Sequence, residues 1–474
     1  MSVRFLRDCM IATVGFLLIF DVAAFESRTV PPVTDVVVVG AGGAGLAAAT
    51  TVAQAGLSVV ILEKMSAIGG NTLRSGGFFN AVGAEQKAKK ADSEALYYNQ
   101  MMVSGAGENT PAVVEVFTRE TYPTLQWLQS LGLQFQTKPQ EVWGSEWPRG
   151  YKPFEPRGHG YIRVLSAELL KRGGMIYTQT RVKKITVSED GGVQGVEYER
   201  NGQKGEITAR KAIVLASGGF SANREMIQKY APQWAGLPTD NNPGNTGDLL
   251  IAAENIGAHI VGMQNVQVVP GGPVGQGFQV RLDIDISRSI LVDGRGNRFI
   301  EEDSARNLLS SAVLQRKAVG VYSLTDQQTV NSYDIVTRKD IYRGLETGSA
   351  YRADTLEELA RLTHMDAEVL LATVRAYNQE VKEKQGKCAR LNCQPLSTGP
   401  FWASPIDLTV HSTLGGIRID ESAHVLRRDG TVIPRLYAAG EVTGNVHGQN
   451  RMGGNGITDA ITFGRIAGLA ITKE

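Results

Sequence analysis

Asp35-Val-Val-Val-Val39 runs directly into Gly40-Ala-Gly-Gly-Ala-Gly45, and the stretch Leu46-Ala-Ala-Ala-Thr-Thr-Val-Ala-Gln-Ala55 follows at once. A short run of β-branched residues favours a buried strand, whereas an alanine-rich stretch favours a helix. The glycines between them mark a tight turn. The order strand, glycine turn, helix is typical of the first unit of a Rossmann-like α/β fold.

The glycine turn has the spacing of a dinucleotide-binding site. Gly40 permits the tight turn, Gly42 lets a pyrophosphate approach the backbone, and Gly45 lets the helix pack against the strand. A second strand, Ser58–Leu62, ends at Glu63, where an acidic side chain can accept hydrogen bonds from ribose hydroxyls. A glycine-rich turn in an ordinary α/β fold is the alternative, but strand, helix and acidic residue together favour dinucleotide binding.

Further glycine-rich segments favour FAD over a nicotinamide cofactor. The loop after Glu63 continues as Ile68–Gly77, and a nicotinamide enzyme does not need this second glycine loop. Ala212–Phe220 and Arg435–Gly444 each have the pattern of a buried strand that ends in glycines, and Asn245–Asp248 is a polar segment of the same kind. Because these segments lie near both ends of the chain, the cofactor domain is predicted to be discontinuous.

The composition is that of a globular protein with almost no net charge. In 474 residues, 49 Lys and Arg nearly cancel 48 Asp and Glu, which argues against nucleic acid or an anionic membrane surface as a partner. The length and the hydrophobic content of 42% predict two or three domains. Function must therefore lie in a local site.

The N-terminus has the layout of a secretory signal peptide. Arg4 and Arg7 precede the apolar stretch Met10–Phe20, and small residues follow at Val22-Ala23-Ala24. The apolar stretch is too short to span a bilayer comfortably. Residues 1–24 are therefore predicted to be a cleaved signal for export to the periplasm or beyond, without stable membrane insertion; an uncleaved hydrophobic anchor is the alternative.

The predicted mature chain keeps two cysteines, Cys388 and Cys393. In an oxidising compartment they form either a small disulfide loop or two free thiols. The sequence contains no Cys-x-x-Cys-His motif and no zinc-type spacing, so neither an attached c-type haem nor a metal site is predicted. A haem that passes electrons to this chain must sit on a partner.

Three longer motifs carry the most specific information: Gly294–Arg306, His411–Gly416 and Gly440–Asp459. They resemble the flavoprotein subunits of fumarate reductase and succinate dehydrogenase, most closely the soluble periplasmic flavocytochrome c fumarate reductases and the urocanate reductases. The resemblance extends from Val33 to Thr472. It implies an FAD-binding domain at residues 33–262 and 411–474, with an inserted α+β capping domain at 263–410 and the active site between them.

The resemblance also implies noncovalent FAD, because the histidine that carries covalent FAD in the membrane-bound complexes is not apparent near Arg74–Gly77. Together with the glycine segments it gives one set of predicted cofactor contacts. These are Gly40, Ala41, Gly42, Gly43, Ala44, Gly45, Glu63, Lys64, Gly69, Gly70, Asn71, Thr72, Ser75, Gly76, Gly77, Val182, Ser217, Gly218, Asn245, Thr246, Gly247, Asp248, Gly440, Glu441, Arg451, Gly454, Asn455, Gly456 and Ile457.

Three residues form the catalytic set that the resemblance implies. His411 and Arg451 match the family's carboxylate-binding pair, because an imidazole and a guanidinium can orient and polarise a carboxylate; a buried structural histidine and a simple ion pair are the alternatives. Arg306 matches the family's proton donor, with electrostatic clamping as the alternative because arginine ordinarily stays protonated. His447 matches a family histidine for which we expect a role in organising its loop.

The chain departs from the fumarate reductase pattern at the far end of the substrate. In an alignment without gaps, the family's second substrate histidine falls on Val269. A buried carboxylate that loses a polar partner is costly. The expected substrate is therefore an enoate other than fumarate, such as an arylacrylate, urocanate or a branched unsaturated acid.

The family's proton relay is also altered. Its threonine, relay glutamate and relay arginine fall on Arg281, Leu282 and Asp285. Asp283 or Asp285 could restore a relay if paired with Arg281 or Arg288. The alternative is a polar strand of the capping domain with salt-bridged faces.

Two other functions stay open at this level. The same clamp serves a dehydrogenase that desaturates a saturated carboxylate or a 3-ketosteroid. A non-catalytic flavin-binding sensor is the other. Because the chain has neither a haem nor an iron–sulfur motif, a separate electron carrier is expected, and a small c-type cytochrome suits an exported protein.

Overall fold

The computed structural model describes residues 29–89, 91–142, 144–272, 278, 280–384 and 393–474. The predicted signal peptide and Cys388 lie outside the described residues, so neither the signal nor a disulfide is tested. The chain divides into two compact units, Met1–Pro31 and Pro32–Glu474. The fold below is that of the second unit.

One large sheet contains the strands that were predicted from the apolar runs. Its order is β17-β18-β8-β1-β2-β5, and β7 and β6 extend it beside β8. Central neighbours run parallel, with Val39 opposite both Leu62 and Leu215. The strands are β1 (Val33–Val39), β2 (Val59–Leu62), β5 (Met175–Tyr177), β6 (Thr180–Val187), β7 (Val193–Arg200), β8 (Gln203–Leu215), β17 (His424–Leu426) and β18 (Val432–Ala438). The predicted Rossmann-like α/β fold is confirmed, since segments far apart in the chain form the parallel centre of one sheet.

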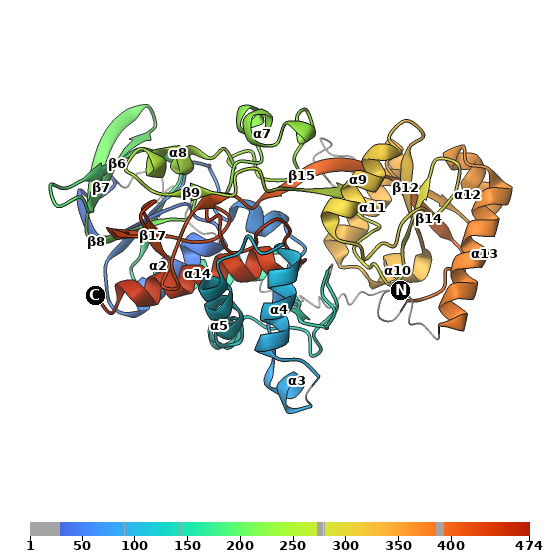
Figure 1. The fold of residues 1–474 in the computed structure, drawn as a ribbon, viewed down its shortest axis with the longest axis horizontal. Coiled ribbons are helices and arrows are strands. Elements are labelled where there is room, and N and C mark those ends of the chain that lie inside the picture. Colours follow the sequence, from blue (N-terminus) through green and yellow to red (C-terminus); the bar gives the residue numbers. More distant parts are fainter. Residues whose placement is uncertain (1–28, 90, 143, 273–277, 279, 385–392) are drawn as a thin grey trace, which may run out of the picture. The chain divides into compact units, whose positions relative to one another are not determined.

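Two helices pack side by side on this sheet, α2 (Gly43–Gln54) and α14 (Asn455–Ile471) (Figure 1). Small residues let them approach closely: a Cβ added at Gly464 would lie 2.3 Å from the carbonyl oxygen of Ala44. Both helices begin after glycines, Gly42 and Gly454, without a side-chain cap. Their first N–H groups are therefore not all satisfied by the chain's own caps.

Two further helices before residue 262, α5 and α6, pack against this core. α5 packs against α14, where the rings of Phe117 and Phe463 stack with centroids 6.1 Å apart. None of the helices in the described part of the chain is both long and apolar enough to cross a membrane. The remaining elements here are α3 (Ala84–Ala88), α4 (Glu94–Ser104), α5 (Pro111–Ser130), α6 (His159–Lys171), α7 (Arg224–Tyr230) and α8 (Asp248–Glu254), with the 3-10 helices η1 (Gly70–Arg74) and η2 (Pro232–Trp234) and the short strands β3 (Phe79–Asn80), β4 (Gly150–Tyr151), β9 (Ile260–Val261) and β16 (Gly416–Ile417).

Four strands between residues 290 and 405 form a second, antiparallel sheet of order β11-β12-β14-β13. Helices α12 and α13 lie beside this sheet (Figure 1). Their apolar side chains, including Leu359 and Leu370, pack with Ile290 and Phe401 of the sheet. This is an α+β arrangement. Its elements are β11 (Ile290–Asp293), α9 (Arg306–Gln315), β12 (Val321–Asp326), α10 (Gln327–Ser332), α11 (Ile335–Thr347), β13 (Tyr351–Ala353), α12 (Leu356–Thr363), α13 (Ala367–Glu383) and β14 (Phe401–Pro405).

The chain enters and leaves this region through an antiparallel pair, β10 (Val266–Gly271) and β15 (Asp407–Thr413). Val266 lies opposite Thr413, and Gly271 lies opposite Asp407. The pair carries several predicted site residues, because Val269 lies on β10 and His411 on β15. Two segments separated by more than a hundred residues therefore meet at one site.

The stretch from Val280 to Ser289 is irregular, so the polar strand considered from its sequence is wrong. The Asp285 carboxylate accepts hydrogen bonds from the backbone N–H and the hydroxyl of Ser287, at 3.0 and 2.6 Å. An aspartate that bonds to the residue two positions on stabilises a turn rather than a strand. The alternating charges thus reflect a turn and local ion pairs.

Candidate active site

A large cavity opens at the carboxyl ends of the central strands and continues to β10, β15 and the start of α9. It is lined by Val39, Leu62, Ala216 and Ala439 at the sheet edge, and farther on by Val269. Ligands of open α/β sheets bind at this edge. The predicted residues that line the cavity are Gly40, Gly42, Gly43, Ala44, Glu63, Lys64, Gly70, Asn71, Thr72, Ser75, Gly76, Gly77, Val182, Ser217, Gly218, Asn245, Asp248, Asp283, Arg306, His411, Gly440, Glu441, Arg451, Gly454, Gly456 and Ile457.

Other predicted residues stand behind the cavity wall. The backbone N–H of Ala41 donates to Glu63 at 2.8 Å, and the backbone N–H of Gly69 donates to the carbonyl of Ala41 at 2.8 Å. Thr246 accepts a hydrogen bond from Lys64 at 2.7 Å. Gly45, Gly247, Asn455 and Asp285 are also absent from the lining. These side chains and backbone groups support the wall instead of forming its surface.

The first glycine turn has the geometry that a pyrophosphate requires. Gly40 adopts φ +108°, and a Cβ added at Gly45 would lie 1.9 Å from the carbonyl oxygen of Gly40. A Cβ added at Gly42 would meet nothing within 4 Å, so the backbone there borders open space. The turn therefore leaves a cradle before the N-terminus of α2, which favours an anion.

Glu63 stands at the end of β2, buried to 8% exposure. One carboxylate oxygen accepts the backbone N–H of Ala41 and the other that of Met65, both at 2.8 Å. Each oxygen retains a further lone pair for a ribose hydroxyl. The predicted role of Glu63 is compatible with this geometry, and the two backbone bonds fix the carboxylate in place.

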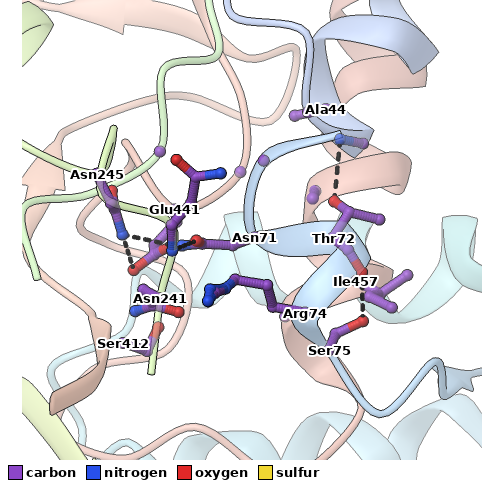
Figure 2. A pocket seen from close by; sticks show the side chains of 18 of the residues that line it. Ala44, Asn71, Thr72, Arg74, Ser75, Asn241, Asn245, Ser412, Glu441 and Ile457 are labelled. Carbon is purple, nitrogen blue, oxygen red and sulfur yellow. Dashed lines mark hydrogen bonds between the residues drawn. The ribbon is translucent and has the colours of Figure 1, made fainter. Parts of the chain in front are cut away.

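Glu441 joins three segments of the cavity wall (Figure 2). Its carboxylate accepts hydrogen bonds from Asn71 at 2.9 Å, from Asn245 at 3.2 Å and from the backbone N–H of Thr413 at 3.1 Å. The amide oxygen of Asn245 is buried without a hydrogen-bond partner among the described residues. A ligand donor would satisfy it.

The second glycine loop is tied to the first through Thr72, whose hydroxyl accepts the backbone N–H of Gly43 at 3.0 Å (Figure 2). Gly454, the residue before α14, also lines the cavity, and it has φ +78° and provides no side-chain cap. The cavity thus offers an open glycine cradle, a fixed carboxylate and two helix N-termini. These features fit FAD, which has a pyrophosphate, a ribose and a ring that gains negative charge on reduction.

Arg306, His411 and Arg451 are brought to this one cavity from α9, β15 and the loop before α14. Burial, together with the positive charges of Arg451 and Arg281, holds the pKa of Arg306 well below its usual value. Burial likewise lowers the pKa of Arg451. The predicted catalytic set is therefore assembled, and its cations are crowded.

Gln267 contacts two members of this set, although no role was predicted for it from the sequence. Arg306 Nη1 donates to Gln267 Oε1 at 2.8 Å, and Gln267 Nε2 donates to the carbonyl of Arg451 at 2.9 Å and to Asn450 Oδ1 at 3.0 Å. Arg306 Nε is buried without a partner among the described residues. A buried glutamine on β10 carries no motif, so no sequence signal marked it.

Asp240 is a second residue that the sequence did not indicate. Its Oδ2 lies 2.8 Å from His411 Nδ1. Burial raises the pKa of Asp240, but His411 and Arg281 outweigh burial and hold it below its ordinary value. Burial lowers the pKa of His411, which Asp240 opposes and Arg306 and Arg451 reinforce.

Of the two proposed relay carboxylates, Asp283 reaches the cavity and Asp285 does not. Arg281 holds Asp283 in a bidentate pair at 2.7 and 2.9 Å. Asp285 lies 3.9 Å from Arg288 and caps a turn. The prediction of a carboxylate near Arg306 thus reduces to Asp283.

His447 lines the cavity but is enclosed by structural contacts. Its Nε2 lies 3.4 Å from Asp459 Oδ2, and its ring meets Phe117 edge-on with centroids 6.3 Å apart. Only 8% of the residue is exposed. This packing suits the loop-organising role expected for it.

Comparison with known proteins agrees with this geometry. The model of the family described as FAD binding domain matches residues 35–457. The chain is 36% identical to fumarate reductase (cytochrome) of Shewanella frigidimarina, over 93% of this chain and 77% of the relative. It is 34% identical to NADH:acrylate oxidoreductase of Vibrio harveyi, over 94% of this chain but only 51% of the relative, so it spans about half the length of that protein.

Among solved structures, the open conformation of a flavocytochrome c3 fumarate reductase superposes with a TM-score of 0.74. That match has 31% identity and covers 95% of this chain and 80% of the other. The chain therefore belongs to the fumarate reductase and succinate dehydrogenase family of FAD-dependent oxidoreductases, and FAD is its cofactor.

Proposed function

We propose that this protein reduces the activated carbon–carbon double bond of a small unsaturated carboxylate. The observation that carries the proposal is the meeting of Arg306, His411 and Arg451 in one cavity with the FAD cradle. Fumarate and acrylate, the substrates named for the two relatives, are both unsaturated carboxylates. Bound FAD, once reduced by an electron carrier, would supply the hydride for one of the two carbons.

The protein's residues supply the remaining parts of the reaction. Arg451 and His411 hold and polarise the carboxylate, which withdraws charge from the double bond. Arg306 donates a proton to the second carbon. Its lowered pKa supports this role, because burial and neighbouring cations reduce the cost of giving up that proton.

Arg306 must regain its proton after each turnover. Asp283 is the candidate relay, since it lines the same cavity and interacts electrostatically with Arg306. Arg281, whose guanidinium donates to Asp283 at 2.7 Å, also interacts electrostatically with Asp240 and Arg306. Asp283 and Arg281 thus replace the altered relay of the family.

The proposed substrate is an enoate other than fumarate. Val269 is 5% exposed and lines the cavity, and it offers no hydrogen bond to a second carboxylate. A monocarboxylate with an apolar or aromatic remainder suits such a wall. An arylacrylate, urocanate or a branched unsaturated acid meets this description.

We also propose that the protein is exported. Residues 33–262 and 411–474 form its FAD domain in this proposal, and residues 263–410 form its capping domain. The β10–β15 pair supports these boundaries, because the chain enters and leaves the region of the second sheet through these two strands. A separate electron carrier, a c-type cytochrome, delivers the electrons. The flavocytochrome likeness supports this choice of carrier.

The test is anaerobic. The flavin of the purified protein is reduced chemically and mixed with fumarate, urocanate, cinnamate, methacrylate and crotonate while flavin absorbance is followed. Rapid reoxidation by an acid other than fumarate is expected. Rapid turnover of fumarate would contradict the substrate proposal, and no reoxidation by any acid, followed by flavin reduction with a saturated acid or steroid, would favour the dehydrogenase.

A further inference from the structure

His411 is held from one side by a buried carboxylate. Its Nδ1 lies 2.8 Å from Oδ2 of Asp240, and Asp240 is 7% exposed. Both residues line the cavity in which the substrate carboxylate is proposed to bind. The orientation of His411, and the ring nitrogen that it presents, therefore depend on Asp240.

We infer that Asp240 is a positioning residue that makes His411 bind the substrate carboxylate as an imidazolium, so that each carboxylate enters the site together with one proton. This inference rests on the proposed function, because it needs a carboxylate at His411. It adds a property that the proposed reaction does not require: proton uptake at the binding step, before any redox chemistry.

The position of the proton on the His411 ring is the first determinant of carboxylate binding. Asp240 is ionised at neutral pH, since its pKa lies below the ordinary value, so it can only accept a hydrogen bond. His411 must then carry its proton on Nδ1. A neutral imidazole in this state presents a lone pair at Nε2, which repels a carboxylate oxygen. His411 can donate to a substrate carboxylate only after Nε2 also gains a proton.

The effect of the neighbouring charges on the pKa of His411 is the second determinant. Arg306 from α9 and Arg451 from the loop before α14 face His411, and burial together with these two cations lowers its pKa despite Asp240. Arg281 faces Asp240 in turn. His411 is therefore neutral in the empty site at pH 7 and above.

A bound carboxylate reverses this balance. Its negative charge offsets the two guanidinium groups and places an acceptor at Nε2, while Asp240 remains at Nδ1. An imidazolium between two carboxylates is favoured by both. The proton comes from solvent, and no bond of the substrate changes.

A second aspartate–histidine pair provides a matched control. His424 Nδ1 lies 2.8 Å from Asp420 Oδ2, the same distance as in the Asp240–His411 pair. Asp420 also accepts the backbone N–H groups of Ser422 and His424, both at 2.9 Å, and neither member of this pair lines the cavity. Its titration is thus not coupled to a ligand in the cavity.

The experiment is isothermal titration calorimetry of the oxidised holoenzyme with cinnamate and, separately, acrylate at pH 7.5, in buffers of different ionisation enthalpy. Oxidised flavin does not reduce these acids, so only binding is measured. The dependence of the heat on the buffer gives the protons taken up per ligand. We expect about one for the wild type and for D420N.

D240N and H411Q should take up far fewer protons when the acid binds. In each variant a neutral side-chain amide replaces one member of the Asp240–His411 pair and can donate a hydrogen bond without gaining a proton. The side-chain amide of D240N can donate to Nδ1, which lets the neutral ring donate from Nε2. Retained flavin absorbance and circular dichroism check that both variants are folded. The wild-type affinity should also fall about tenfold per pH unit above neutrality.

Two failures can be told apart. Binding without proton uptake, a flat pH dependence of wild-type affinity, or unchanged uptake in D240N would overturn the role of Asp240 and leave the proposed reaction standing. Absence of binding by both acids, together with no reoxidation of the reduced flavin by any acid, would overturn the proposed function as well.

Discussion

The guanidinium of Arg306 donates a hydrogen bond from Nη1 to Oε1 of Gln267 at 2.8 Å, and the amide of Gln267 donates in turn to the carbonyl of Arg451 at 2.9 Å. One buried side chain on β10 thus links the proposed proton donor to the segment that carries the proposed carboxylate clamp. Gln267 is not itself part of the cavity lining. Its effect on the reaction is therefore through orientation.

Q267L should slow the proton-transfer step without abolishing binding. Removing the acceptor frees Arg306 to turn, and a misplacement of about 1 Å costs roughly 100-fold in rate. We expect the limiting rate of flavin reoxidation to fall by 10- to 100-fold, with little change in the acid concentration at half-saturation. The exposed Gln449, which bonds to Glu108, supplies the control: Q449L should behave as the wild type.

Alanine substitutions can separate the role of Gly42, which borders the cofactor space, from that of Gly45, which lets the helix pack closely. G42A places a methyl group in open space, so stability should be retained while FAD affinity falls. G45A forces a Cβ to within 1.9 Å of the Gly40 carbonyl, so the fold itself should be destabilised. Thermal unfolding of the apoprotein and fluorescence titration with FAD measure the two effects. Equal FAD affinity of G42A and the wild type would place the pyrophosphate elsewhere.

The side chain at position 269 should set the preference between mono- and dicarboxylates. V269H adds a hydrogen-bond donor to the cavity wall, and a hydrogen bond to a charged group contributes about 1.5–3 kcal/mol, or tenfold and more in affinity. The ratio of reoxidation rates with fumarate and cinnamate should rise by that factor. V269A, which adds space without a donor, should not raise it. A V269H ratio equal to that of V269A would refute this assignment.

The buried ion pair between Arg149 and Asp92 should contribute strongly to stability. Arg149 is fully buried and holds Asp92 in a bidentate pair at 2.6 Å, with its guanidinium 4.4 Å from the centre of the Tyr97 ring. Breaking a buried pair leaves an uncompensated charge, so R149M should lower the free energy of unfolding by about 3–5 kcal/mol.

The matched comparison is R163A, which breaks the exposed Arg163–Glu155 pair. Exposed pairs contribute about 0–1 kcal/mol. Urea unfolding followed by circular dichroism measures both variants. A loss of similar size in the two variants would mean that burial does not decide the outcome.

The sequence alone predicts the strand, turn and helix around the first glycine turn. Gly40, Gly42, Gly45 and Glu63 are constrained by their neighbours in the chain, because a strand, a turn and a helix formed from consecutive residues leave few alternatives. The same holds for strands β8 and β18, whose apolar runs end in glycines. Local rules predict such features.

The substrate half depends on contacts between distant segments. Asp240 and Gln267 have no motif, and they acquire roles only because β15 and α9 bring His411 and Arg306 beside them. Asp285 was a reasonable relay candidate by spacing, but its turn with Ser287 directs it away from the cavity lining. The roles of these residues therefore depend on contacts between segments that are distant in the sequence.

The rate of flavin reoxidation in wild type and R306M tests the central claim most directly. Chemically reduced protein is mixed anaerobically with increasing concentrations of the preferred unsaturated acid. We predict saturable, rapid reoxidation in the wild type, and in R306M a limiting rate lower by a factor of about 100 or more with a similar half-saturating concentration. Reoxidation of R306M at the wild-type rate, or no response of the wild type to any unsaturated acid, would contradict it.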